Sequence, residues 1–174
     1  MLFRRKRLPR LSSWYEYLST ICFRKPLSNG KKILNYLNLS IKNLDHFKTI
    51  HNYINLKDMI LRKGAISAYR GERVLIPINM KDGSIIAIGK GNKEYNYSAP
   101  HGAGRIISRR QAKQVLSLEK FERVMEGIYT TSISKDTLDE APFVYKPMEE
   151  ILENIQDTVE VLQIIKPVYN FKAN

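Results

Sequence analysis

Three short apolar segments separated by turn-forming residues constrain the fold of this 174-residue chain more than any other feature. The segments are residues 65–69, 73–78 and 84–88, and the dipeptides Gly71-Glu72 and Asp82-Gly83 stand between them. Apolar runs of this length that are bounded by glycine turns are typical of neighbouring strands. The sequence therefore predicts β-structure in the middle of the chain.

The last third of the chain is predicted to be mostly helical. Ser108 stands three residues before Gln111, a capping-box pattern that begins a helix, and Ser117 is placed to cap the next helix. The longest helix is expected over Pro147–Ile165, because proline is common in a first helical turn and Pro167 follows the end of the segment. Its apolar stripe consists of Met148, Ile151, Leu152, Ile155, Val159 and Leu162.

The segment before the strands has a weaker pattern. Residues 33–63 look helical at first and loop-like around His51-Asn52. Together the three regions predict an α+β fold, in which central antiparallel or mixed strands are followed by C-terminal helices.

Positive charge is concentrated at one end of the chain. The net charge is +12; residues 1–70 carry 15 lysines and arginines against three acidic residues, whereas residues 71–174 carry 14 of each. A basic segment of this kind contacts nucleic acid, an anionic membrane or nothing specific. We expect two parts, a basic head at residues 1–32 that is unrelated to the rest or disordered, and a folded part at residues 33–174.

Cysteine content and hydropathy bear on the compartment. Cys22 is the only cysteine, which excludes an internal disulfide and fits a reducing compartment. No uncharged apolar run approaches the length of about 18 residues that a membrane span requires. We therefore expect a cytoplasmic protein without a membrane partner.

The segment Ser98–Arg105 carries the clearest chemical signal. His101 stands between Pro100 and Gly102, and Gly104 follows, so the imidazole is next to a backbone almost without side chains. Glycines let a phosphate group approach peptide N–H groups closely, which suits a histidine that acts as a nucleophile on phosphorus. A histidine beside a glycine-rich turn is also a common structural arrangement, so this segment alone leaves both interpretations open.

Several segments in a fixed order resemble one family. From about residue 45 to the C-terminus, the chain resembles the RtcB family of GTP-dependent RNA ligases. The matching segments are Thr49–Ile54, Arg62–Ala68, Ile76–Met80 with Asp82-Gly83-Ser84, Ser98–Arg105 with Ser108-Arg109, Asp139–Pro142 with Tyr145-Lys146, and Tyr169–Lys172.

The resemblance implies a reaction. The family joins an RNA 3′-phosphate or 2′,3′-cyclic phosphate end to a 5′-hydroxyl end, in tRNA splicing and RNA repair. His101 would attack the α-phosphate of GTP and become guanylylated, the guanylyl group would pass to the RNA 3′-phosphate, and the 5′-hydroxyl would displace GMP. The expected cofactors are GTP and Mn²⁺. The expected partners are RNA, as tRNA halves or broken RNA, and an archease-type activator.

Site residues follow from the matching positions. The resemblance implies that His101 is catalytic, that His51 ligates the metal, and that Tyr145 stacks on guanine. The nucleotide-binding residues that it implies are His51, Asn52, Pro77, Ile78, Asn79, Met80, Ser84, His101, Gly102, Ala103, Gly104 and Lys172. Ordinary structural roles stay open for several of these. His51 could be a capping or surface residue, residues 77–84 a strand end with its turn, Tyr145 a core residue and Lys172 part of a frayed terminus.

The resemblance breaks in the first 40 residues. The family's other metal ligands, including an aspartate three residues before a cysteine, have no counterpart there, and Ser19 occupies that position relative to Cys22. We therefore expect residues 33–174 to be the C-terminal portion of a longer ligase, with little or no ligase activity in isolation. The missing N-terminal half, as a separate polypeptide, is then a further expected partner. The alternatives are a catalytically inactive RNA- or nucleotide-binding remnant and a purely structural protein.

Overall fold

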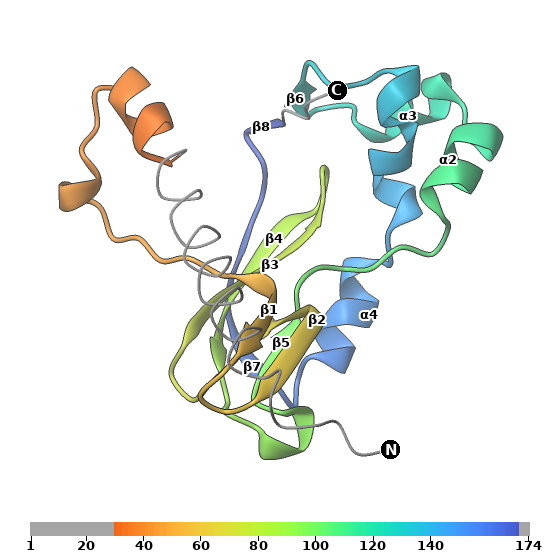
Figure 1. Cartoon of the computed structure of the whole chain (residues 1–174). Coiled ribbons are helices and arrows are strands. Elements are labelled where there is room, and N and C mark those ends of the chain that lie inside the picture. Colours follow the sequence, from red (N-terminus) through yellow and green to blue (C-terminus); the bar gives the residue numbers. More distant parts are fainter. Residues whose placement is uncertain (1–29, 171–174) are drawn as a thin grey trace, which may run out of the picture. The chain divides into compact units, whose positions relative to one another are not determined.

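The computed structural model describes residues 30–170 and divides the chain into two compact units, which meet in sequence between Lys63 and Gly64 (Figure 1). The predicted basic head, residues 1–32, lies almost wholly outside the described residues, so its boundary stays a prediction. Within residues 30–170, no helix is long and apolar enough to cross a membrane.

The described part of the first unit contains a short helix, one strand and the beginning of a second strand. Residues 30–36 are helical, as expected from residue 33 onwards, and the 3-10 turn η1 (Ile41–Asn43) follows. The prediction of a loop around His51-Asn52 is wrong, because His51 begins strand β1 (His51–Asn55). In the turn that follows, the Asn55 side chain accepts hydrogen bonds from the N–H groups of Lys57 and Asp58, at 3.0 and 3.3 Å. This turn leads the chain into β2 (Ile60–Ser67), the neighbour of β1.

Antiparallel strands form the centre of the second unit. Residues 65–67 of β2 pair with β5 (Ser98–Pro100), and the 3-10 turn η2 (Lys93–Tyr95) lies shortly before β5. A second sheet has the order β3-β4-β7, with β3 (Arg73–Asn79) and β4 (Gly83–Gly89) joined by the predicted tight turn (Figure 1). The predicted α+β class and the three central strands are therefore confirmed.

The turn at Gly71-Glu72 does not join neighbouring strands, contrary to the prediction. It connects β2 and β3, which belong to different sheets. The Glu72 carboxylate accepts hydrogen bonds from the Ser67 hydroxyl at 2.6 Å and from the Tyr69 N–H at 3.0 Å. These bonds stabilise the turn, through which the chain passes from the sheet that contains β2 to the sheet that contains β3.

The long helix predicted over Pro147–Ile165 is wrong in its second half. Only α4 (Met148–Asn154) is helical, with Pro147 as its N-cap residue, and β7 (Val159–Ile165) is a strand. The Thr158 N–H and hydroxyl both donate to the Ile155 carbonyl, at 2.9 and 3.0 Å, and end the helical turn. The β-branched residues that follow favour a strand, and pairing with β4 stabilises it.

The remaining helices form the other part of the second unit. Ser108 caps α2 (Arg109–Val115) and Ser117 caps α3 (Leu118–Val124), and each hydroxyl accepts from an N–H three residues later, as predicted. The 3-10 helices η3 (Lys135–Glu140) and η4 (Pro142–Val144) follow. The two-residue strands β6 (Tyr129–Thr130) and β8 (Tyr169–Asn170) pair in parallel.

Two apolar cores meet at one residue. The first lies between the strands and α4 and contains Ile76, Ile85 and Ile155, all fully buried. The second lies among α2, α3 and η3 and contains Phe121. Tyr145 packs against both cores, so it marks the place where the strands and the helices meet.

Two glycines at turns give a test of the sheet. We expect Gly83→Ala to lower the free energy of unfolding by roughly 3 kcal/mol, because the new Cβ would lie 2.0 Å from the Ile165 carbonyl oxygen and φ is +86°. Gly71→Ala is the matched control: its φ is +80°, but nothing lies within 4 Å of the new Cβ. It should cost only about 1 kcal/mol. Urea denaturation measures both, and equal losses would contradict the β4–β7 packing.

Candidate functional site

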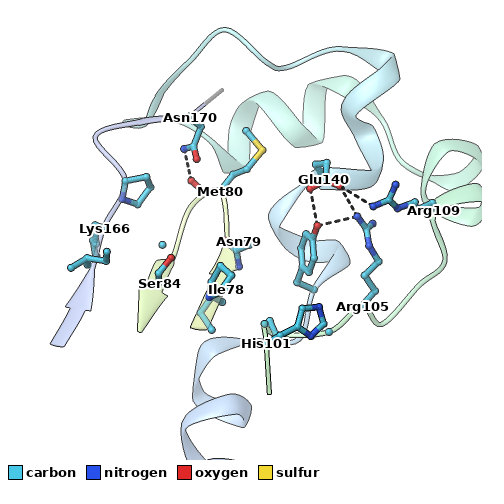
Figure 2. Close-up of a pocket in the computed structure, with 18 residues that line it drawn as sticks. Ile78, Asn79, Met80, Ser84, His101, Arg105, Arg109, Glu140, Lys166 and Asn170 are labelled. Carbon is cyan, nitrogen blue, oxygen red and sulfur yellow. Dashed lines mark hydrogen bonds and ion pairs between the residues drawn. The ribbon is translucent and has the colours of Figure 1, made fainter. Parts of the chain in front are cut away.

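A pocket of about 680 Å³ lies entirely within the second unit (Figure 2). Four segments line it: residues 77–80 and 83–84 from the β3–β4 hairpin, residues 101–105 after β5, and residues 165–167 at the end of β7. Single residues complete the wall, namely Arg109, Glu140, Tyr145 and Asn170. The pocket therefore lies where the sheet, the helical part and the C-terminal segment converge.

Most residues that the resemblance assigned to the nucleotide line this pocket. They are Pro77, Ile78, Asn79, Met80, Ser84, His101, Gly102, Ala103 and Gly104, and Tyr145 joins them. His51 and Asn52 belong to the first unit, where both are exposed residues of β1. Lys172 lies outside the described residues. The binding roles of all these residues stay predictions.

The end of β3 provides a rigid rim. The Asn79 side chain accepts from the N–H groups of Lys81 and Asp82, both at 2.8 Å, and donates to the Asp82 carboxylate at 2.7 Å. The side chains of Ile78 and Met80 are buried. The Asn79 side chain is therefore engaged in the turn that follows β3.

Hydrogen bonds on both sides hold the histidine loop. The His101 N–H donates to the Gly64 carbonyl at 3.3 Å, and the Ala103 N–H donates to the Pro77 carbonyl at 3.2 Å. A Cβ at residue 102 would lie only 3.2 Å from the same Pro77 oxygen, so a glycine suits this close approach. The His101 side chain is half-buried and lines the pocket, with Gly64 beneath its ring. The imidazole therefore faces a cleft and is not packed into the core.

Charged groups gather on one wall of the pocket, which the sequence did not predict. One Arg105 nitrogen lies 2.7 Å from a Glu140 carboxylate oxygen, and the other donates to the Asp139 carbonyl. Arg109 is 73% exposed and lies 3.7 Å from the Asp139 carboxylate. Figure 2 shows Arg105, Arg109 and Glu140 together on one side, with Ser84 and Lys166 on the other and His101 at one end.

The tyrosine hydroxyl belongs to the same network. The Tyr145 hydroxyl donates to Glu140 at 2.9 Å and accepts from Arg105 at 3.0 Å. The Arg105 guanidinium also lies 4.8 Å from the centre of the Tyr145 ring. Burial, and then the hydrogen bond and charge of Glu140, raise the pKa of Tyr145 to about 12. The hydroxyl therefore keeps its proton at neutral pH and uses it in the hydrogen bond to Glu140.

The C-terminal segment closes the opposite rim. The Asn170 amide donates to the Met80 carbonyl at 2.7 Å, and the Thr130 hydroxyl donates to the Asn170 carbonyl at 3.0 Å. Sequence reasoning missed Asn170 as well as the two arginines and Glu140 as pocket residues. All four stand inside the matching segments, and this was the only signal that could have pointed to them.

The pocket contains groups that suit a nucleotide, whereas the described residues contain no group of side chains that suits a metal ion. Arginines, a glycine loop and an aromatic ring are groups that bind phosphates and bases. Among residues 30–170, no three histidine, cysteine, aspartate or glutamate side chains lie close enough to hold a metal ion. The predicted ligand His51 is not part of such a group, so the described residues do not provide a manganese site.

Comparisons with known proteins agree on one family. The family described as "tRNA-splicing ligase RtcB" matches residues 29–173. The chain is 34% identical over 129 residues to the RNA-splicing ligase RtcB of Escherichia coli strain K12, which is 71% of this chain and 31% of that protein. It is 35% identical over 115 residues to the tRNA-splicing ligase RtcB of Aeropyrum pernix, covering 56% and 24%. The chain thus spans about a third of the length of its Escherichia coli relative.

The raised pKa of Tyr145 predicts a pH dependence. Because the folded protein holds this proton more tightly than the unfolded chain, the stabilisation is complete below the ordinary pKa of 10.0 and is lost as the pH rises towards 12. We expect ultraviolet titration of tyrosinate to show one group near pH 12 that is absent in Tyr145→Phe. The melting temperature should also fall less steeply between pH 10 and 12 in that variant.

The exposed Tyr36 provides the control for this titration, since Tyr36→Phe should leave the high-pH group in place. A titration of Tyr145→Phe that still contains the group near pH 12 would contradict the assignment.

Proposed function

Because this chain belongs to the RtcB family, we propose that its second unit binds GTP and supplies the histidine that takes up GMP in RNA ligation. One observation carries the proposal: His101 lines the same pocket as the glycine loop, the two arginines and the residues assigned to guanosine. The relatives are named RNA-splicing and tRNA-splicing ligases, which supports RNA as the substrate that receives the guanylyl group.

The pocket walls fit the two ends of a nucleotide. Arg105 and Arg109 provide positive charge for phosphate oxygens, and the loop at Gly102 and Gly104 allows close approach of a phosphate. Residues 77–80 form the wall beside the Ser84 hydroxyl, which can hydrogen-bond to the edge of a base. Tyr145 adds an aromatic ring to the wall.

The chemical step is a displacement at the α-phosphorus. A nitrogen of the His101 imidazole forms the new P–N bond, the bond from phosphorus to the β-phosphate oxygen breaks, and pyrophosphate leaves. The ring loses its N–H proton, so the product is a neutral imidazole phosphoramidate. Arg105 and Arg109 are placed to stabilise negative charge on the transferring phosphate. Because the described residues do not form a metal site, no step is assigned to a metal ion.

Two further displacements would complete ligation. The RNA 3′-phosphate attacks the guanylylated histidine and frees the imidazole, which regains a proton. The 5′-hydroxyl of the second RNA end then attacks the activated phosphate, forms the phosphodiester bond and releases GMP. A chain that binds GTP but completes none of these transfers would be a nucleotide-binding remnant, the second candidate function.

Binding and transfer have separate tests. Equilibrium dialysis of the full chain against GTP should show saturable binding that unlabelled GTP displaces better than ATP. The chain is then incubated with α-labelled GTP and manganese and separated by denaturing electrophoresis. Label that stays on the protein, and is lost in His101→Ala, supports transfer to that residue.

The matched control is His46→Ala, which removes an exposed histidine of the first unit. It should leave both binding and labelling unchanged. GTP binding without any labelling would favour the nucleotide-binding remnant over the ligase. A chain that binds no GTP would contradict both functions.

A further inference from the structure

We propose that Glu140 is a positioning residue of the nucleotide site, because its carboxylate holds the Arg105 guanidinium with one oxygen and the Tyr145 hydroxyl with the other. This inference rests on the proposed function, since it concerns how the GTP pocket is organised. Figure 2 shows Glu140 on the wall beside Arg105 and Arg109, with His101 at the end of the same cavity.

The three groups form a closed triangle of hydrogen bonds. Arg105 to Glu140 is 2.7 Å, Tyr145 to Glu140 is 2.9 Å, and Arg105 to Tyr145 is 3.0 Å. Each side chain therefore has two partners within the triangle. An arginine and a tyrosine that are held in this way lose most of their rotamer freedom before any ligand arrives.

Glu140 is not needed to bring the two segments together. The Ile106 N–H donates to the Val144 carbonyl at 2.8 Å, and the Lys146 N–H donates to the Gly104 carbonyl at 3.2 Å. These backbone bonds already pair the segment around Arg105 with the segment around Tyr145. The carboxylate adds control of side chains on the pocket wall, above all Arg105 and Tyr145, with Arg109 more distant at 3.9 Å. This is a role in ligand binding more than in folding.

The charge of Glu140 gives an opposite expectation, which makes the proposal testable. A carboxylate in the wall opposes the binding of a triphosphate, so a purely electrostatic effect predicts that its removal strengthens GTP binding. Loss of positioning predicts weaker binding, since Arg105 and the Tyr145 ring would then be ordered at the expense of binding energy. The sign of the change in affinity separates the two effects.

Two substitutions separate charge from reach. Glu140→Gln keeps the length of the side chain and removes its charge, whereas Glu140→Asp keeps the charge and shortens the reach by one methylene. We expect both to weaken GTP binding to the full chain by roughly tenfold, the size typical of a lost charge-assisted hydrogen bond. A charge effect alone would tighten binding in Glu140→Gln and leave Glu140→Asp unchanged. Either of these results would overturn the proposal.

The matched control removes a carboxylate outside the pocket. Glu150 pairs with Lys146 at 2.5 Å but does not line the cavity. Glu150→Gln should keep the GTP affinity of the wild type. Melting temperatures are measured for all variants, and the positioning role requires weaker binding in variants that still melt cooperatively.

A variant at Tyr145 tests the same triangle from the other side, and its single effect can be measured even if the Glu140 variants do not fold. Tyr145→Phe removes the two sides of the triangle that use the hydroxyl and leaves the Arg105–Glu140 pair in place. It should by itself weaken GTP binding. Where Glu140→Gln folds, the double variant should lose less than the sum of the single losses, because the two residues act together. Additive losses would mean that Glu140 does not act through Tyr145, and would overturn the inference.

One readout does not depend on nucleotide. Glu140 contributes to the raised pKa of Tyr145, so Glu140→Gln should lower that pKa, although burial keeps it above the ordinary value.

A wild-type chain that binds GTP, with variants that bind equally well, would overturn this inference and leave the proposed function intact. A wild-type chain that binds no GTP would contradict the proposed function, and this inference with it, even if the pKa of Tyr145 shifts as expected.

Discussion

The backbone pairing of residues 104–106 with residues 144–146 is the constraint on which the pocket depends. Two N–H to carbonyl bonds form this joint and make Arg105 and Tyr145 partners in an antiparallel bridge. Tyr145 packs against both apolar cores, so the joint connects the strands to the helical part. The histidine loop ends at the joint and begins at β5, and it is therefore fixed at both ends. A loop that is held in this way can present an imidazole to a cleft without first having to be ordered.

Local interactions explain which elements the sequence could predict. The β3–β4 turn and the serine caps of α2 and α3 depend on residues within a few positions of each other, and all of them form as expected. The segment after α4 was assigned to a helix because Ile155 and Val159 continue the apolar spacing of the helical stripe. Its strand conformation depends on pairing with β4, about 75 residues earlier in sequence, and no local pattern contains that information. The same holds for the separation of β2 and β3 into two sheets.

The candidate site divides in a similar way. Residues of the contiguous segments at 77–80 and 101–104 could be assigned from the resemblance, and the structure brings them into one pocket. The charged wall could not be assigned, because Arg105 and Glu140 are 35 positions apart and no local pattern contains their contact. His51 and Asn52 belong to the other unit, so their part in the site stays a prediction. A resemblance thus identifies the residues of a site more readily than the contacts that orient them.

The two arginines of the wall would meet an anion at different cost. The Arg105 side chain is 21% exposed and already ordered by Glu140, Tyr145 and the Asp139 carbonyl. Binding an anion there costs little further side-chain entropy, but the anion competes with the Glu140 carboxylate. The Arg109 side chain is 73% exposed, and its carboxylate contacts are 3.7 and 3.9 Å long. Ordering such a side chain costs up to about 2 kcal/mol, but its charge is less neutralised. Within the proposed function, Arg105 therefore contributes orientation, and Arg109 contributes most of the attraction for phosphate.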